Sequence, residues 1–160
     1  MGFLFQDAAL FDSLTLYENL ALPLFRLTNK TPKEVDFAID RVLQQVGLAG
    51  DKQKMPSELS GGMRKRAGLA RALVLEPKIL LADEPSSGLD RITASEIDEL
   101  LLKQKAEHKT TLIVVTHDVR GARHVGDRLL VLDQGRLIAD GTPAEIEHSE
   151  NEIARKLMSE

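Results

Sequence analysis

A serine followed by two glycines, in the run Leu59-Ser60-Gly61-Gly62-Met63, precedes a stretch with helical spacing. Serine at a helix N-cap leaves several backbone N–H groups exposed at the helix N-terminus, where the helix dipole adds partial positive charge. Two glycines let the backbone approach a ligand without interference from a Cβ atom. The pattern favours binding of an anion such as a phosphate. A plain serine-capped helix that begins with glycines is the structural alternative.

Two acidic residues, Asp83 and Glu84, end an apolar run at residues 79–82 that is typical of a buried strand. Carboxylates at the carboxyl edge of a parallel sheet lie where α/β proteins bind ligands. Asp83 is suited to hold Mg²⁺ directly or through water, and Glu84 to orient and deprotonate an attacking water. The alternative is a strand that ends in a solvated acidic turn.

A histidine, His117, follows a second strand-like run at residues 112–116. A histidine in this position is suited to donate a hydrogen bond to a phosphate oxygen. We expect it on the same sheet edge as Glu84, because the carboxyl ends of parallel strands share one edge. A lone histidine after a strand is otherwise a structural residue.

Three segments carry the signature of a capping box, in which Thr caps the amide at N3 and a Glu three residues on reaches back. They begin at Thr15, Thr31 and Thr142. Two of them place Pro at the first helical position, where its missing N–H costs nothing. Apolar residues at helical spacing follow the second box, and Gly47 ends that helix.

Strand-like and helical segments alternate along the rest of the chain. We expect helices at residues 60–75 and 93–107, strands at 2–5, 78–83, 110–116 and 128–133, and a hairpin that continues through 134–139. Buried apolar strands alternating with helices predict an α/β fold with parallel central strands. The first 75 residues contain one strand candidate, so residues 11–75 are expected to form a helical subdomain. Residues 1–10 and 76–160 would then form the sheet part of a single domain.

Composition excludes several classes of protein. The formal net charge of −4 counts against a nucleic-acid partner, because such proteins carry a basic excess that neutralises phosphates. The absence of cysteine excludes disulfides and thiolate metal sites. The apolar runs are strand-length, and the start lacks the basic and long apolar regions of a signal peptide. The sequence is therefore typical of a cytosolic protein.

In combination these segments resemble the nucleotide-binding domain of ABC transporters, in the family's order and over nearly the whole chain. The corresponding motifs are the Q-loop (Phe5-Gln6), the signature (residues 59–63), the Walker B strand (79–83), the catalytic glutamate (Glu84), the D-loop (Ser87-Gly88-Leu89-Asp90) and the switch histidine (His117). The resemblance implies a P-loop NTPase-like core, with flanking helices on a partly parallel sheet and an inserted helical subdomain.

The resemblance also implies cofactors, roles and partners. ATP and Mg²⁺ would lie between two ATPase domains, with the signature acting across the dimer. Glu84, His117 and Gln6 would be catalytic, and Asp83 and Gln6 would serve Mg²⁺. Nucleotide binding is implied for Ser60, Gly61, Gly62, Met63 and Asp90. The helical subdomain would touch permease subunits, and Gln6 would couple it to the sheet core. The ATPase would be cytoplasmic and peripheral on the inner face of the membrane.

The chain departs from the family pattern in three ways. It has no Gly-x-x-x-x-Gly-Lys followed by Ser or Thr, the loop that holds phosphates in this family. Met63 stands in place of the commoner Gln of the signature, and Arg91 stands where Pro often follows the D-loop Asp. We expect the 160-residue chain alone to show no hydrolysis above background, because the amides and Lys of that loop hold the β- and γ-phosphates.

The position of Met1 leads to a further expectation. It lies almost on the Q-loop, partway through a strand expected inside the sheet, so we interpret it as an internal methionine of a longer gene. Such a start would remove elements that cover the apolar runs at Leu80, Ile113 and Val131. Reading the frame upstream tests this interpretation.

Within the family, the Q-loop region (residues 5–15), the 62–66 segment and the 84–90 segment are most similar to ATPases of the Mla/Mce type, which serve phospholipid transport in bacterial envelopes. Amino-acid importers and lipoprotein exporters share much of the pattern. A non-catalytic partner that donates only the signature is another alternative. The DNA-repair and chromosome ATPases require a long coiled coil that this sequence lacks. The basic residues Arg64, Lys65, Arg66 and Arg71 are interpreted as a solvated helix face.

Overall fold

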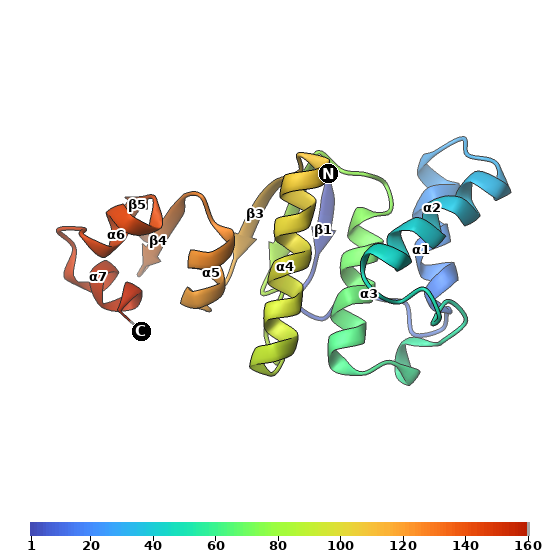
Figure 1. The fold of residues 1–160 in the computed structure, drawn as a ribbon, viewed down its shortest axis with the longest axis horizontal. Helices are drawn as coiled ribbons and strands as arrows, with labels where there is room; N and C mark the ends of the chain where they lie inside the picture. Colours follow the sequence, from blue (N-terminus) through green and yellow to red (C-terminus); the bar gives the residue numbers. More distant parts are fainter. Residues whose placement is uncertain (160) are drawn as a thin grey trace. The chain divides into compact units, whose positions relative to one another are not determined.

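The computed structural model describes residues 1–159, in two compact units that span Met1–Val115 and Thr116–Glu160 (Figure 1). The first unit contains β1 (Gly2–Leu4), α1 (Leu16–Leu27), α2 (Pro32–Gln45), the 3-10 turn η1 (Pro56–Glu58), α3 (Gly61–Leu73), β2 (Ile79–Asp83), α4 (Arg91–His108) and β3 (Thr111–Val115). The second contains α5 (Val119–Val125), β4 (Leu129–Asp133), β5 (Arg136–Gly141), α6 (Pro143–Glu147) and α7 (Glu152–Met158).

A parallel sheet with strand order β1-β2-β3 is the centre of the first unit. Leu4 is opposite Ala82, which in turn is opposite Val114. Leu4, Leu80 and Ala82 are buried on one face of the sheet, where α3 packs against β1 and α4 packs against β3. Figure 1 shows α4 lying along this sheet. The α/β class predicted from the sequence is confirmed.

The other face of this sheet is exposed. Phe3 and Ile113 lie on one cross-strand row of that face, and their side chains are 49% and 52% exposed. The prediction of a buried strand at residues 110–116 is therefore wrong, because β3 is an edge strand that alternates exposed and half-buried residues. β1 also lies at an edge of the sheet rather than inside it. Of the apolar runs expected to lack cover, Ile113 is exposed, but Leu80 is fully buried.

Helices α1 and α2 begin at the capping boxes that the sequence predicts. The side chains of Thr15 and Thr31 accept from the N3 amides, and Glu18 and Glu34 bond back to the cap residues. The apolar residues of the two helices pack against each other and against α3. Gly47, with φ of +71°, follows α2 in the left-handed conformation that glycine adopts without strain. Within residues 1–159, no helix combines the length and the apolar character that crossing a membrane requires.

The second unit is built on an antiparallel hairpin. β4 pairs with β5, and the turn residues Gln134 and Gly135 both have positive φ, as a type I′ turn requires. The prediction of a third buried strand at residues 128–133 is wrong, because only one face of β4 is covered: Leu130 and Leu132 are exposed, whereas Leu129 on the other face packs against the core of this unit. Val131, expected to lack cover, packs against the core formed by Ile146, Ala154 and Met158.

Candidate functional site

The carboxyl end of β2 carries the two acidic residues. Asp83 is the last residue of the strand and is exposed, and Glu84 follows it half-buried. The backbone of Glu84 has φ of +47°, which is uncommon for a residue other than glycine. Its N–H donates to the carbonyl of Val115 at 2.8 Å, so the end of β3 holds the turn in place. Unusual backbone of this kind persists only where the surrounding structure enforces it, as at functional sites.

The Q-loop residue Gln6 follows β1 and is exposed. Beyond it, Ala8 and Ala9 both adopt left-handed conformations, with φ of 61° and 49°. Ala8 is buried, and its N–H donates to the carbonyl of Phe5 at 2.9 Å. The chain therefore turns tightly here, and residues 5–11 lie against another element.

The signature segment forms the N-terminus of α3, as the sequence predicts. Ser60 is the N-cap, and its hydroxyl accepts from the amide of Met63 at 3.2 Å. A Cβ added to Gly62 would lie 2.5 Å from Cγ2 of Thr93, so close packing of α3 on α4 requires a glycine there. A Cβ on Gly61 would meet nothing nearer than Leu89 at 3.9 Å. Packing within the chain therefore gives no reason for Gly61, which leaves its surface open to a ligand.

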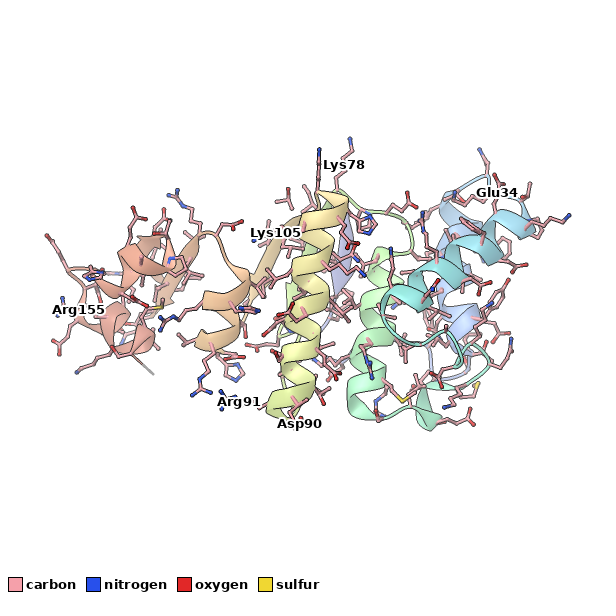
Figure 2. The ribbon with its side chains drawn as sticks, viewed as in Figure 1. Glu34, Lys78, Asp90, Arg91, Lys105 and Arg155 are labelled. Carbon is pink, nitrogen blue, oxygen red and sulfur yellow. The ribbon has the colours of Figure 1, made fainter. Side chains whose placement is uncertain are left out.

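The D-loop residue Asp90 is the N-cap of α4 (Figure 2). Its carboxylate accepts from the amides of Ile92 and Thr93 at 3.0 and 3.1 Å, and from the Thr93 hydroxyl at 2.7 Å. These bonds, led by the one from the Thr93 side chain, lower the pKa of Asp90. Arg91 is the first helical residue, the position at which Pro is also favoured. Its backbone position explains why Arg and Pro are both compatible with this site.

Lys65 connects the loops that carry these motifs. Its Nζ donates to the carbonyl of Gln6 at 2.5 Å, to the carbonyl of Glu84 at 2.8 Å and to the hydroxyl of Ser87 at 3.2 Å. The residue is 7% exposed. Burial lowers the pKa of its ammonium, against the opposing charges of nearby carboxylates. The interpretation of Lys65 as part of a solvated basic face is therefore wrong.

Sequence reasoning missed Lys65 because it treated consecutive basic residues of α3 as one surface. A usable signal was present: Lys65 begins an i, i+4, i+7, i+8 series with Leu69, Ala72 and Leu73, all of which are buried. A lysine in register with a buried apolar stripe must find acceptors inside the protein. The same helix also places Arg71 against the loop, where its guanidinium donates to the carbonyl of Ala9.

The Q-loop, signature helix and D-loop together line a hollow of about 420 Å³. Its walls include Gln6, Asp7, Gly61, Arg64 and Ser87. Of the predicted site residues, Gln6 and Gly61 line this hollow, together with residues 87–89 of the D-loop, and Lys65 links it to the loop of Glu84. His117 belongs to the second unit, directly before Asp118, which caps α5. Its predicted place on the edge occupied by Glu84 stays a prediction.

The donor types at the carboxyl ends of β1 and β2 fit a magnesium ion bound together with a nucleotide. Mg²⁺ is held through one or two carboxylates, with phosphates and waters as its remaining ligands. Asp83 supplies an exposed carboxylate, and Gln6 supplies a side-chain oxygen donor. Over residues 1–159, no three His, Asp or Glu side chains form a group that could hold a metal ion.

Curated relatives share this sequence over nearly its whole length. The chain is 44% identical over 158 residues to the "Probable ribonucleotide transport ATP-binding protein mkl" of Mycobacterium leprae, an alignment that covers 99% of the chain and 46% of the relative. It is 37% identical over 161 residues to "Methionine import ATP-binding protein MetN 1" of Pseudomonas putida, covering 100% of the chain and 48% of that protein. The chain thus spans about half the length of the curated relatives that it matches.

Solved structures share the fold. The cassette MJ0796, described as a dimeric bacterial ABC transporter cassette, superposes with a TM-score of 0.80 at 35% identity, covering 89% of the chain and 62% of MJ0796. CbiO1 of Clostridium perfringens superposes with a TM-score of 0.83 at 35% identity, covering 98% of the chain and 62% of CbiO1. Residues 1–87 match the sequence family described as "ABC transporter". The chain therefore belongs to the ABC transporter family, among its ATP-binding domains.

Proposed function

We propose that this chain is part of the ATP-hydrolysing subunit of an ABC transporter, with the reaction centred on Glu84. The observation that carries the proposal is the convergence of the carbonyls of Gln6 and Glu84 and the hydroxyl of Ser87 on one ammonium group of the signature helix. The Q-loop, the signature helix and the turn at residues 84–87, which are far apart in the sequence, are thereby held beside one another. Structures that hydrolyse a nucleotide need such convergence, because catalysis depends on positioned charges and donors.

Each residue of the site has a role in this proposal. Glu84 accepts a proton from the attacking water, and His117 donates to a phosphate oxygen. Asp83 and the side chain of Gln6 would hold the magnesium ion that accompanies ATP. The amides at Gly61, Gly62 and Met63 and the hydroxyl of Ser60 face the phosphates of a nucleotide held by a second ATPase domain. ATP supplies the phosphoanhydride bond whose cleavage drives transport.

The arrangement of partners follows from the same proposal. The signature of one domain completes the site of another, so the working unit is an ATPase dimer. MJ0796, a relative by structure, is dimeric in a state bound to ADP and phosphate, and CbiO1 is part of the complex named CbiONQ. We propose that this chain likewise works with permease subunits, through the helical subdomain at residues 11–75, and is attached by them to the cytoplasmic face of a membrane.

For the cargo we propose phospholipid or a related lipid, as in the Mla/Mce type. Support comes from the segments that resemble that type: the Q-loop region, the 62–66 continuation of the signature and the 84–90 turn. The names of the relatives favour other cargoes, since one is named for ribonucleotide transport and another for methionine import. Reconstitution with the cognate permease distinguishes these. Lipid cargo predicts ATPase stimulation by donor phospholipid, and stimulation by methionine or ribonucleotides instead would refute it.

Exchange of Glu84 for glutamine tests the catalytic proposal. In the full-length gene product, Glu84→Gln is expected to abolish steady-state ATP hydrolysis and to leave ATP binding intact, because the amide keeps the shape but accepts no proton at neutral pH. Phosphate release and equilibrium nucleotide binding measure the two effects. Glu107→Gln on the exposed surface of α4 is the matched control. Retention of most of the rate would refute the catalytic role and favour a partner that donates only the signature.

A further inference from the structure

One face of α3 holds the whole Q-loop segment. Lys65 bonds to the carbonyl of Gln6, and Arg71 bonds to the carbonyl of Ala9, with its guanidinium 5.0 Å from the ring centre of Phe11. Between them Gly68 is so close to Ala8 that an added Cβ would lie 2.7 Å from the Cβ of Ala8. These three helix residues are spaced three apart, which places them along one side of the helix. Residues 5–11 therefore follow α3 over two turns.

Lys65 differs from the other two because it also reaches the turn that carries Glu84. An ammonium group has three N–H bonds, and here it has three acceptors: the carbonyls of Gln6 and Glu84 and the hydroxyl of Ser87. Hydrogen bonds from a charged donor are stronger than neutral ones, and burial reduces competition from water. The full donor capacity of Lys65 is thus used inside the protein.

The turn after β2 depends on such support. Glu84 has a left-handed backbone, and its carbonyl accepts both from Lys65 and, at 3.2 Å, from the amide of Ser87. Its amide is held by Val115 on β3. A strained backbone relaxes unless its peptide groups are held from several directions. Among these bonds, the one from Lys65 is the link to α3.

We propose that Lys65 is a positioning residue that fixes the Q-loop and the Glu84 turn to the signature helix, so that the two loops do not move independently. It touches neither reacting atoms nor nucleotide in this role and acts through the backbone carbonyls of Gln6 and Glu84. The inference deepens the proposed function and rests on it for the statement that Glu84 is catalytic. The physical link itself is independent of that statement.

Hydrogen exchange measured by mass spectrometry on the full-length gene product tests the link. Lys65→Met keeps most of the side-chain length and removes the donor. Exchange in peptides covering residues 5–11 and 84–89 is expected to rise about tenfold in both, the factor for losing a hydrogen bond from a charged donor. Arg71 bonds to the carbonyl of Ala9 and lies over the ring of Phe11, so Arg71→Met is expected to raise exchange in residues 5–11 only. Lys103→Met, at an exposed lysine of α4, is the control that changes neither.

Steady-state kinetics distinguish a positioning role from a role in stability alone, because only a positioning role changes kcat while KM stays the same. Lys65→Met is expected to lower kcat for ATP hydrolysis about tenfold with KM for ATP unchanged, because the turn bearing Glu84 is displaced while the binding surface stays. Lys65→Gln restores part of kcat, because its amide has two N–H bonds for the three acceptors. If Lys65→Met does not fold, Lys65→Gln serves in the exchange experiment, where exchange is expected to rise in both segments, by a smaller factor than in Lys65→Met.

The outcomes separate this inference from the proposed function. Unchanged exchange in both segments of a folded Lys65 variant overturns the inference, even if Glu84→Gln abolishes hydrolysis. If both segments loosen while Glu84→Gln keeps its rate, the positioning role stands and the catalytic assignment falls. Loosening of one segment alone in Lys65→Met shows that the loops are held separately, and it also overturns the inference.

Discussion

Substitution of Gly68 by alanine introduces a methyl group where α3 meets the Q-loop. The new Cβ would lie 2.7 Å from the Cβ, 2.8 Å from the Cα and 3.1 Å from the carbonyl oxygen of Ala8. Ala8 cannot easily withdraw, because it is buried in a left-handed turn and its amide is bonded to Phe5. Overpacking of a core costs about 1–3 kcal/mol, and contact with backbone points to the upper end of that range. The gain in helix propensity from Gly to Ala is about 1 kcal/mol. We therefore expect a net loss of about 2 kcal/mol in the free energy of unfolding.

Urea titration followed by circular dichroism measures this loss, with the free energy extrapolated linearly to water. Gly61→Ala is the matched control on the same helix, because its added Cβ meets nothing within 3.9 Å. That variant is expected to keep the stability of the wild type or to gain a few tenths of a kcal/mol, roughly, from helix propensity. A Gly68→Ala protein as stable as Gly61→Ala would show that residues 5–11 do not lie tightly on α3, and it would contradict the packing argued from Gly68 and Ala8.

Two further predictions concern a helix cap and the histidine. Thr31→Ala is expected to cost about 1 kcal/mol in urea titrations at neutral pH, because it removes the N-cap of α2. Bonds from the Thr31 amide and, second, from its hydroxyl lower the pKa of Glu34. Thr31→Ala removes only the hydroxyl's bond to that carboxylate, so this part of the stability difference is present above the unfolded pKa of about 4.3 and is lost as pH falls through the folded value. A stability difference that grew on acidification would contradict it. His117→Ala in the full-length gene product is expected to lower kcat about a hundredfold with ATP binding retained, and the exposed His124 provides the control substitution.

Local signals predicted most elements of the fold. The capping boxes at Thr15, Thr31 and Thr142 all form, because the Thr and Glu that make them are neighbours in sequence and need no tertiary context. The Ser60 cap and the strand at residues 79–83 were predicted for the same reason. Strand pairing was predicted less well. Apolar runs at residues 112–115 and 129–132 indicate strands, but a run does not specify its partner or which of its faces is covered.

The candidate site residues were predicted from sequence motifs. The residues that hold the site loops in place, Lys65 and Gly68, were not predicted. The predicted site residues at strand ends could be found because the strands themselves are recognisable from their apolar runs. These residues are Gln6, Asp83 and Glu84. Lys65 lies among basic residues, and its burial depends on three acceptors from two loops, neither of them adjacent to it in sequence. No turn or motif in the sequence indicates why residue 68 is a glycine. Glycine is needed there because Ala8, in a loop 60 residues earlier in the chain, lies against this position. Contacts of this kind between distant segments can be identified only from the tertiary structure.

The glycines of α3 give an argument about function that the sequence alone could not give. Gly62 is required by Thr93, whose side chain is held in place by its bond to Asp90, and Gly68 is required by Ala8. A glycine in the middle of a helix costs about 1 kcal/mol relative to alanine, so Gly62 and Gly68 each have a physical reason. Gly61 has none within the first unit, where its Cβ position is open. We propose that Gly61 leaves room for the close approach of a ligand to the amides at the start of α3. That is the geometry expected if the signature binds the phosphates of a nucleotide held by a second domain.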